Sequence, residues 1–442
     1  MSGGYAQGSV TGDLLSDREI AALFSDDAAV REMVAVETAL ARIEGRLGII
    51  PAAAAAAIER AAAAFVPDMA ALRSGAEASG VPVIALVDQL RAAVGGEAAS
   101  YIHWGATSQD IIDTALVLRL RRTAKILSGR LDGLIESLAD LATRHRGRAM
   151  VARTRFQHAL PTTFGLEVAG WSAALQRNAT RLAELRPRFE VVQFGGAAGT
   201  LASLGKDGVA VMEALAAELD LGAPALPWHA HRDALTEFAG WLALVTGALG
   251  KIGLDVALHA QSEVGELRVG ADGAGGSSTL AHKVNPVGAE VLVTLGRMNA
   301  ALVSSAHQAL LHAQQRDGSA WQLEWLTLPQ MAVSCGAALR QAQDLVAFLT
   351  VDAGRMAANL AASNGMIFAE AATFALARHM ARSDAQALVK DACAETRRDG
   401  TPLDQVLKAR TTAPVDWAEV FDPRSSVASA DALITRALAR KD

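Results

Sequence analysis

Residues 113 to 146 read DTALVLRLRRTAKILSGRLDGLIESLADLATRHR, and their pattern indicates the fold class. The apolar residues recur in steps of three and four, which places them in one stripe along one face of an α-helix. A helix of this length would extend for about 50 Å, well beyond the usual length in globular proteins. The stripe consists of Leu116, Leu120, Ala124, Leu127, Leu131, Leu134, Leu138 and Leu141.

Four further stretches share this periodicity, and five such stripes predict a bundle of long helices. Strand signals, which need alternating β-branched or aromatic residues, are scarce. Long helices cannot cover one another's apolar faces inside a small globule, so they either pack lengthwise in a large bundle or associate between subunits, and we expect a homo-oligomer. The further stripes lie at 235–256, at 291–302, at 171–182 before Pro187, and at 335–345 after Pro329.

The sequence predicts an all-α protein in three parts. A short-helix region runs from residue 1 to 110 and includes the alanine-rich run 52–57. The long-helix bundle follows at 111–350, and a second helical region occupies 351–442, with breaks at Asn364-Gly365 and Asp399-Gly400. We expect the alanine-rich run to be helical, because Ile58-Glu59-Arg60 continues its pattern.

Composition narrows the range of partners. The chain has 442 residues, 41 Lys and Arg against 47 Asp and Glu, and a net charge of −6, so bulk charge attracts neither nucleic acid nor an anionic membrane. The first thirteen residues lack the basic and apolar parts of a secretory signal. The apolar run 238–250 stops at Lys251, short of a membrane span. Cys335 and Cys393 do not suggest a disulfide framework, so we expect a cytoplasmic protein without a membrane segment.

A first polar segment, HWGATSQD at residues 103–110, precedes the long helix. Hydroxyls and free backbone N–H groups at a helix start can bind a carboxylate. Thr107, Ser108 or Asp110 could equally be a simple N-cap. The segment alone leaves both interpretations open.

A second segment, RTRFQHALPTT at residues 153–163, collects polar side chains before another helix. Guanidinium groups suit carboxylates, and a histidine can carry a proton near neutral pH. The alternative is a solvated loop with a helix cap. The candidate substrate-binding residues are Arg153, Arg155, Gln157 and Thr162, with His158 as a candidate catalytic residue.

A third segment, GAGGSSTLAHKVNP at residues 273–286, joins glycines to proton-transfer and oxyanion-stabilising side chains. A flexible connection between helices is the alternative. Neither a phosphate loop nor a nucleophile elbow fits, although a Ser-Lys hydrolase stays possible. The candidates are Ser277, Lys283 and Asn285 for catalysis and Ser278 and His282 for substrate binding.

The pair His229 and His231 has the spacing of a His-x-His metal site. A metal site needs further ligands, and the adjacent Arg232 would oppose a cation. We therefore predict an anion-binding or helix-start role for His229 and Arg232, and no metal.

Together these segments resemble the fumarase/aspartase superfamily, and within it the bacterial cycloisomerases that lactonise 3-carboxy-cis,cis-muconate. The similar stretches are HWGATSQDIIDTALVLRLR at 103–121, QHALPTTFGLEVAGW at 157–171, FGGAAGTLASLG at 194–205, PWHAHRD at 227–233, QSEVGE at 261–266 and GGSSTLAHKVNPVGA at 275–289. They span nearly the whole chain.

The resemblance implies a fold, an assembly and a reaction. The fold would be the superfamily's three-domain helical bundle, and the assembly a homotetramer whose active sites each collect residues from three subunits. No cofactor would be needed, and the substrate would be a small polycarboxylate. Ser277 would transfer a proton with His158 as its rival, Lys283 and Asn285 would stabilise negative charge, and His103, Thr107 and Ser108 would help to bind substrate.

Departures from the cycloisomerase pattern leave alternatives open. Arg155 stands where cycloisomerases usually have Trp, Leu280-Ala281 replaces Met-Pro, and His231 replaces Gln. Glu324-Trp325 resembles the cycloisomerase pairing and disfavours a nucleotide substrate. A fumarate-forming β-elimination from a substituted succinate, such as nitrosuccinate or an amino-acid derivative, is the alternative activity. A non-catalytic scaffold of the same fold is a third possibility.

Overall fold

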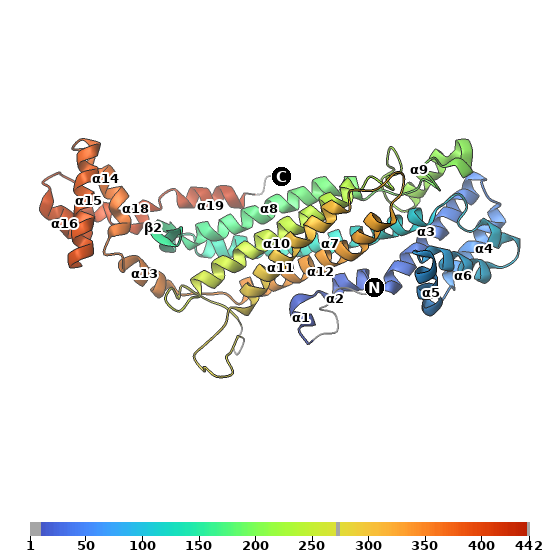
Figure 1. Cartoon of the computed structure of the whole chain (residues 1–442). Helices are drawn as coiled ribbons and strands as arrows, with labels where there is room; N and C mark the ends of the chain where they lie inside the picture. The colour runs from blue at the N-terminus through green and yellow to red at the C-terminus, as the bar shows by residue number, and fades with distance from the viewer. Residues whose placement is uncertain (1–9, 271–274, 440–442) are drawn as a thin grey trace. The chain divides into compact units, whose positions relative to one another are not determined.

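The computed structural model describes residues 10–270 and 275–439 (Figure 1). These residues are mostly helical, which confirms the all-α prediction. The predicted long helices are present, and the first begins five residues before Asp113. The five long helices are α7 (Ser108–Arg144), α8 (Phe164–Phe189), α10 (Asp233–His259), α11 (Val287–Gln308) and α12 (Gly318–Ala347).

Shorter elements precede, connect and follow the long helices. The two small sheets in the described residues are antiparallel pairs, β1 (Ala149–Thr154) with β2 (Gln157–Thr163) and β3 (Leu267–Arg268) with β4 (Thr350–Val351). The other elements are α1 (Gly12–Leu15), α2 (Arg18–Leu23), α3 (Asp26–Leu47), α4 (Ala52–Ala63), α5 (Met69–Ser79), α6 (Val83–Val94), η1 (Glu97–Tyr101), η2 (Ala202–Asp207), α9 (Gly208–Glu218), α13 (Ala353–Ala361), η3 (Met366–Phe368), α14 (Ala369–Leu376), α15 (Arg382–Asp399), α16 (Leu403–Arg410), α17 (Trp417–Val420), α18 (Pro423–Ser426) and α19 (Ala430–Leu438).

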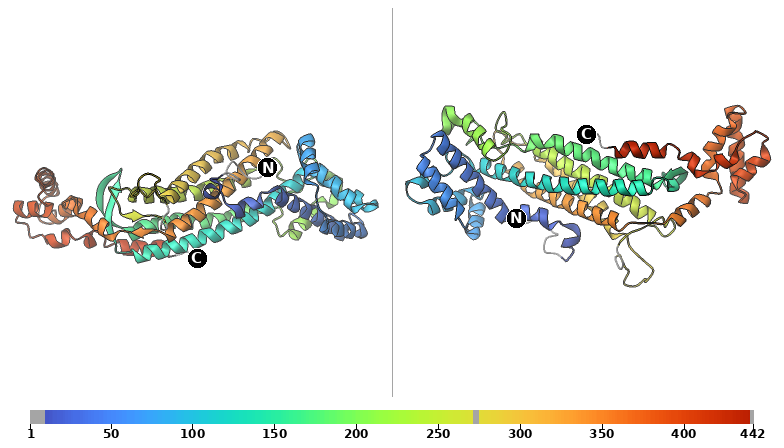
Figure 2. Two further views of the ribbon diagram at one scale, coloured as in Figure 1. Left: turned by 90° about the horizontal axis from the view of Figure 1, so that it is seen from below. Right: turned by 180° about the vertical axis from the view of Figure 1, so that it is seen from behind.

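The chain forms two compact units, and each long helix passes from one into the other. The first unit contains 10–130, 178–247 and 294–339; the second contains the described residues of 131–177, 248–293 and 340–439. Within each unit the segments of the five long helices run side by side (Figure 2). Helix α7 begins at Ser108 and α12 ends at Ala347, close to the expected boundaries near 110 and 350. The division into three domains stays a prediction.

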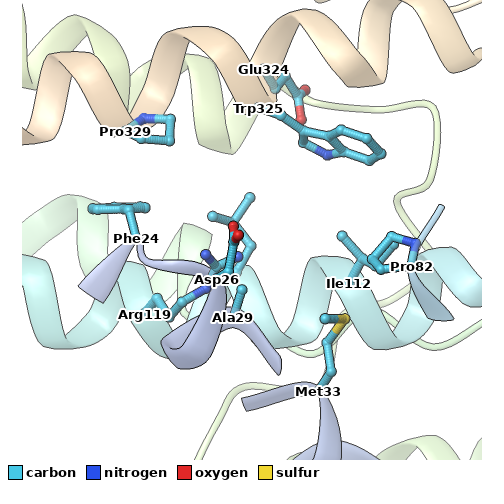
Figure 3. Close-up of a pocket in the computed structure, with 11 residues that line it drawn as sticks. Phe24, Asp26, Ala29, Met33, Pro82, Ile112, Arg119, Glu324, Trp325 and Pro329 are labelled. Carbon is cyan, nitrogen blue, oxygen red and sulfur yellow. The ribbon is translucent and has the colours of Figure 1, made fainter. Parts of the chain in front are cut away.

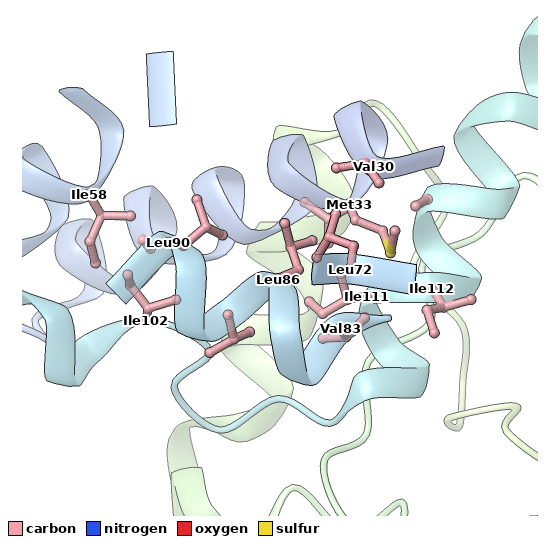
Figure 4. Close-up of a cluster of buried hydrophobic side chains, with 14 of the residues drawn as sticks. Val30, Met33, Ile58, Leu72, Val83, Leu86, Leu90, Ile102, Ile111 and Ile112 are labelled. Carbon is pink, nitrogen blue, oxygen red and sulfur yellow. The ribbon is translucent and has the colours of Figure 1, made fainter. Parts of the chain in front are cut away.

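The first unit has its apolar core between the short helices and the start of α7. Helix α3 begins where Ser25 Oγ accepts a hydrogen bond from the backbone N–H of Ala28 at 3.2 Å, which satisfies one free donor of the first turn. Its buried face packs with α4, α6 and α7 around Leu86, Leu90 and Ile111 (Figure 4). This packing fixes α3 against the segment that precedes α7.

In the second unit, the polar segment 153–163, for which a solvated loop was the alternative interpretation, forms a β-hairpin. Thr154 pairs with Gln157, so Arg155 and Phe156 form a two-residue turn. Both have positive φ, 50° and 65°, as a type I′ turn requires. No clear sign of this hairpin is present in the sequence. Strand signals are scarce, and the turn lacks the usual Asn-Gly pair. Helix α8 follows directly from Thr163.

Two prolines that were expected to bound helices lie inside them. Pro187 is within α8 and Pro329 is within α12. A proline removes one backbone hydrogen bond and costs about 3 kcal/mol in a helix interior. Close neighbours such as Leu185, Phe189 and Met331 are almost fully buried, and burying such a side chain contributes about 1.5–3 kcal/mol. Packing on both sides of the proline therefore keeps each helix continuous.

Helices α10 and α11 are long and apolar enough to cross a membrane by length and composition alone. Half of the most apolar window of α10 is buried inside the structure, and 28% of that of α11. Phe238, Leu242 and Val245, which belong to the stripe found in the sequence, are fully buried. Both are core helices of the bundle.

Candidate active site

Asp110 organises the first polar segment in the first unit. It lies in the first turn of α7 and is fully buried. One carboxylate oxygen accepts hydrogen bonds from the backbone N–H groups of Thr107 and Gly196, at 3.0 and 2.9 Å. The other accepts from Gly195 N at 2.9 Å and lies 2.6 Å from His229 Nε2. Asp110 thus caps α7 and also joins three separate stretches of chain.

Asp113, one turn further along α7, holds Arg232. The Arg232 guanidinium contacts both oxygens of Asp113, at 2.5 and 3.1 Å, and both oxygens of Glu324, at 2.8 and 2.5 Å. Trp321 Nε1 donates to Asp113 at 2.9 Å. Burial alone lowers the pKa of Arg232, but the two carboxylates outweigh this and raise it.

The side chain of Arg232 is therefore committed inside the protein. It is 1% exposed, and each of its three nitrogens donates to a carboxylate. This arrangement argues against the expected direct contact with substrate. His229, 4% exposed and held by Asp110, is similarly enclosed. Both residues instead fix the loop before α10 against α7.

Arg316 is a residue of this cluster that the sequence analysis missed. It precedes α12, and its Nη1 donates to Thr107 Oγ1 at 2.9 Å while Nη2 donates to the carbonyl of Ala197 at 2.9 Å. Within the described residues no carboxylate forms an ion pair with it. Its guanidinium is exposed beside Thr107 and near the start of α7, where Ser108 is half-buried. Its sequence, QQRDG, carries no motif that would have marked it.

His103 lies in the same segment with an unusual backbone. Its φ is 65°, and its Nδ1 lies 2.6 Å from Oε1 of Glu37 on α3. Glu37 belongs to no motif recognised in the sequence. His103, Thr107, Ser108, His229 and Arg232 therefore all belong to the first unit.

In the second unit, Arg153 anchors the hairpin. Its Nη1 and Nη2 donate to the two oxygens of Glu266, at 2.9 and 2.8 Å. Glu266 is fully buried and also contacts His259 Nδ1 at 2.8 Å and Asn359 Nδ2 at 2.8 Å. Burial opposes ionisation of Glu266, but these partners lower its pKa to about 2. Arg153 thus ties the hairpin to Glu266 rather than serving as a free binding group.

A groove with a volume of about 850 Å³, lined by more apolar than polar surface, runs beside the hairpin. Arg155, His158 and Thr162 line one part of it, and helices α8 and α10 supply the rest through residues such as Trp171 and Lys251. The side chains of Arg155 and His158 are exposed and have no ion-pair partner in the described residues. Gln157 is exposed on the same hairpin without lining the groove. The groove therefore offers two free basic groups.

The serine segment forms a loop that is closed at its base. Asn285 donates to the carbonyl of Gly275 through its backbone N–H at 2.8 Å and through Nδ2 at 3.1 Å. Gly275 has φ 74°, and a Cβ there would lie 2.3 Å from the Asn285 carbonyl oxygen, so only glycine fits. Ser277 Oγ accepts a hydrogen bond from the backbone N–H of Leu280 at 3.1 Å. Gly273, a glycine of the same segment, lies outside the described residues.

The loop presents its remaining candidates to solvent. Ser278, His282 and Lys283 are exposed. Within the described residues, no hydrogen bond joins this loop to the hairpin that carries His158. All four candidate catalytic residues belong to the second unit, whereas Thr107 and Arg316 belong to the first.

A second, mostly apolar cavity of about 190 Å³ lies in the first unit (Figure 3). Phe24, Met33, Ile112 and Trp325 line it from different elements. None of the site residues expected from the sequence reaches it. Its lining lacks the cluster of free basic groups that a polycarboxylate needs, so we do not assign the reaction to it.

Comparisons with known proteins cover nearly the whole chain. A family model described as "Lyase" matches residues 15–301, and one described as "Adenylosuccinate lyase C-terminus" matches residues 365–437. The chain is 43% identical to the 3-carboxy-cis,cis-muconate cycloisomerase of Pseudomonas aeruginosa, over 95% of this chain and 93% of that protein. It is 38% identical to the nitrosuccinate lyase of Streptomyces davaonensis, over 96% and 93% of the two chains.

A solved structure shares the fold. The crystal structure of the 3-carboxy-cis,cis-muconate lactonizing enzyme from Pseudomonas putida matches with a TM-score of 0.91 at 38% identity, covering 97% of this chain and 98% of that one. The "Lyase" model alone covers more than half of the sequence. The chain therefore belongs to this lyase family, the fumarase/aspartase superfamily, and is an enzyme of it.

Proposed function

We propose that the protein is a cycloisomerase that converts 3-carboxy-cis,cis-muconate to a carboxymuconolactone in aromatic (protocatechuate) catabolism. The observation that carries the proposal is the 43% identity with a cycloisomerase over 95% of the chain. The free basic groups Arg155, His158 and Arg316 support it, because a substrate with three carboxylates needs several cations that are not already paired.

The proposed reaction is intramolecular. A carboxylate oxygen of the substrate forms a C–O bond to a carbon of the conjugated diene, and the displaced electron pair moves toward another carboxylate as an enolate-like dianion. Ser277 or His158 delivers a proton to carbon, which completes the lactone. Lys283 and Asn285 stabilise the negative charge that develops before this protonation. The reaction adds one proton to the substrate and releases no fragment.

The remaining side chains divide between binding and support. Thr107, Ser108 and Arg316 hold one carboxylate at the start of α7, while Arg155 receives another. In the structure, the side-chain amide of Asn285 donates a hydrogen bond to the carbonyl of Gly275. To stabilise negative charge, Asn285 must either give up this bond or donate through its second amide hydrogen. The supporting binding set is His103, Gln157, Thr162, Ser278 and His282. No cofactor takes part in the proposal.

We also propose a homotetramer with active sites shared by three subunits. The candidate groups are divided between two units of one chain, and helix α11 leaves much apolar surface uncovered. Assembly would supply each site with a first-unit cluster and a second-unit hairpin or loop from different copies. The proposed protein is cytoplasmic, with no nucleic-acid or membrane partner.

A fumarate-forming β-elimination lyase is the second candidate. Two observations favour it: Arg155 at the exposed tip of the hairpin and the 38% identity with a nitrosuccinate lyase. A substituted succinate has two carboxylates, which Arg155 and Arg316 could receive. The two candidates differ in product and can be separated directly.

An ultraviolet assay tests the proposal. Purified protein is offered 3-carboxymuconate and, separately, nitrosuccinate. We expect loss of the diene absorbance with formation of lactone; fumarate from nitrosuccinate without turnover of the diene would instead establish the second candidate.

Ser277→Ala tests the proton-transfer step in the same assay. We expect the variant to fold normally and to lose about 10²–10⁴-fold in turnover, as for loss of a general acid. Ser383→Ala is the matched control, because Ser383 is exposed and bonds only to its neighbour Asp384. Near-normal turnover of Ser277→Ala would leave His158 as the proton donor.

A further inference from the structure

The imidazole of His103 is held in one orientation by a buried carboxylate. His103 Nδ1 lies 2.6 Å from Glu37 Oε1, and the side chains are 17% and 2% exposed. No partner of Nε2 is present among the described residues. A left-handed φ of 65° is uncommon for a residue with a side chain and often marks a functional position. The pairing therefore fixes Nδ1 inward and leaves Nε2 as the outward nitrogen.

A second buried glutamate follows Glu37 on the same face of α3. Glu44 is two helical turns further on and fully buried, and among the described residues neither of its carboxylate oxygens has a hydrogen-bond partner. The second oxygen of Glu37 is also buried without a partner. A buried ionised carboxylate without a partner is costly, so one member of this pair must be neutral.

The surroundings identify which of the two glutamates carries the proton. Burial and the nearby charge of Glu37 raise the pKa of Glu44 to about 9, so Glu44 is protonated near neutral pH. Glu37 has a cationic partner available in His103, while Glu44 has none. Glu37 is therefore the member that keeps the negative charge.

The charged groups around His103 come from three elements. Burial lowers the pKa of His103, but the charge of Glu37 on α3 and the hydrogen bond to it, together with Asp110 on α7, outweigh burial and raise it. Arg91 on α6 acts in the opposite direction. The net effect favours an imidazolium ion that donates from both nitrogens.

We propose that Glu37 is a positioning residue that holds His103 as an outward-facing cationic donor, so that His103 binds a substrate carboxylate beside Thr107. The role of Glu44 is to stay neutral and leave the single negative charge on Glu37. The part that concerns substrate rests on the proposed function; the orientation and charge of His103 do not. This adds a residue of α3 to a site otherwise built from motif residues.

Chemical modification tests the charge of His103 without any substrate. Diethyl pyrocarbonate reacts with neutral imidazole, so the pH at which His103 reaches half its maximal modification reports its protonation. Peptide mass spectrometry follows each histidine in the same sample between pH 5 and 9. In the wild-type protein we expect the midpoint of His103 to lie above the ordinary value of about 6.5.

The Glu37→Gln variant removes the charge while keeping the shape. We expect the His103 midpoint to move to lower pH by about one unit or more, while exposed His379 keeps its midpoint. Glu44→Gln is the matched buried variant on the same helix, and replacing a neutral carboxyl should leave His103 nearly unchanged. If Glu37→Gln does not fold, the midpoint of His103 modification in the wild-type protein still tests whether the pKa of His103 is raised.

Three outcomes would overturn the inference: a wild-type His103 midpoint at or below the ordinary value, no shift in folded Glu37→Gln, or an equal shift in Glu44→Gln. Kinetics with the substrate that the ultraviolet assay identifies then test the contact itself. We expect Glu37→Gln to raise KM at least tenfold at pH 8 and to change kcat less. A normal KM with a shifted midpoint would refute the substrate contact, whereas absence of turnover in the wild-type protein would refute only the proposed function.

Discussion

The guanidinium of Arg232 lies between the carboxylates of Asp113 and Glu324, and the Arg232 side chain is buried. Removing one partner from a buried ion pair leaves an uncompensated charge and typically costs about 3–5 kcal/mol. We therefore expect Arg232→Met to lower the free energy of unfolding by about that amount in urea titration. Arg188→Met is the control, because Arg188 pairs with Glu237 at the surface; equal losses in both variants would contradict the structural role of Arg232.

His259 links stability to pH through its two acidic neighbours, Glu167 and Glu266. Burial opposes its charge, but hydrogen bonds to these carboxylates raise its pKa to about 9. The stabilisation is complete below the unfolded value of about 6.5 and is lost as pH rises toward 9. We expect the free energy of unfolding to fall between pH 6.5 and 9, and His259→Gln to remove most of this slope. An unchanged slope would refute the assignment, and exposed His379→Gln serves as the control.

Residue types at the site were largely readable from the sequence, whereas their partners were not. Thr107, His158 and Ser277 lie in motifs dense with polar residues and glycine. Arg316 and Glu37 act through contacts across 209 and 66 positions of the chain. Such pairings follow from tertiary packing, so no local pattern could have identified them.

At the scale of elements, periodicity predicted the five long helices and failed at the hairpin and the prolines. A stripe of buried leucines is a strong local signal, because every third or fourth residue repeats it. The hairpin has a short β1 and an Arg155-Phe156 turn without glycine, so its signal is weak. In a sequence, prolines such as Pro187 and Pro329 are typical of helix ends, but packing across the bundle overrides that preference.

The turn of this hairpin is expected to lower the stability of the protein while contributing to substrate binding. Arg155 and Phe156 both occupy left-handed backbone conformations, which cost of order 1 kcal/mol each for residues with side chains. We expect the double variant Arg155→Asn/Phe156→Gly to raise the melting temperature and to weaken binding of a polycarboxylate, seen as a higher KM. A variant with unchanged KM would exclude Arg155 from substrate binding.

Asp220→Gly provides the matched control for the hairpin. Asp220 also has positive φ, 53°, and is exposed in the first unit, where its carboxylate pairs with Arg121 at 3.7 Å. Glycine there should relieve backbone strain without any change in KM. A comparable loss of activity in this variant would show that altered stability, rather than the missing guanidinium, caused the effect in the hairpin variant.

For the whole molecule, helix α11 carries the argument for assembly. Its apolar window is only 28% buried within one chain, and Met298 is 43% exposed. Soluble proteins rarely leave continuous apolar helix surface in water, so a second copy is the expected cover. The same assembly would let Thr107 of one copy and His158 of another serve a single site.

Met298→Glu tests this assembly, because a charge at a buried interface between copies costs far more than one left in water. We expect light scattering after size exclusion to show a tetramer for the wild-type protein and smaller species for Met298→Glu, with turnover falling as the tetramer dissociates. Leu433→Glu, at a somewhat more exposed position on α19, is the control and should remain tetrameric. A wild-type monomer with full turnover would mean that one chain completes its own active site, which would remove the reason for sharing residues between subunits.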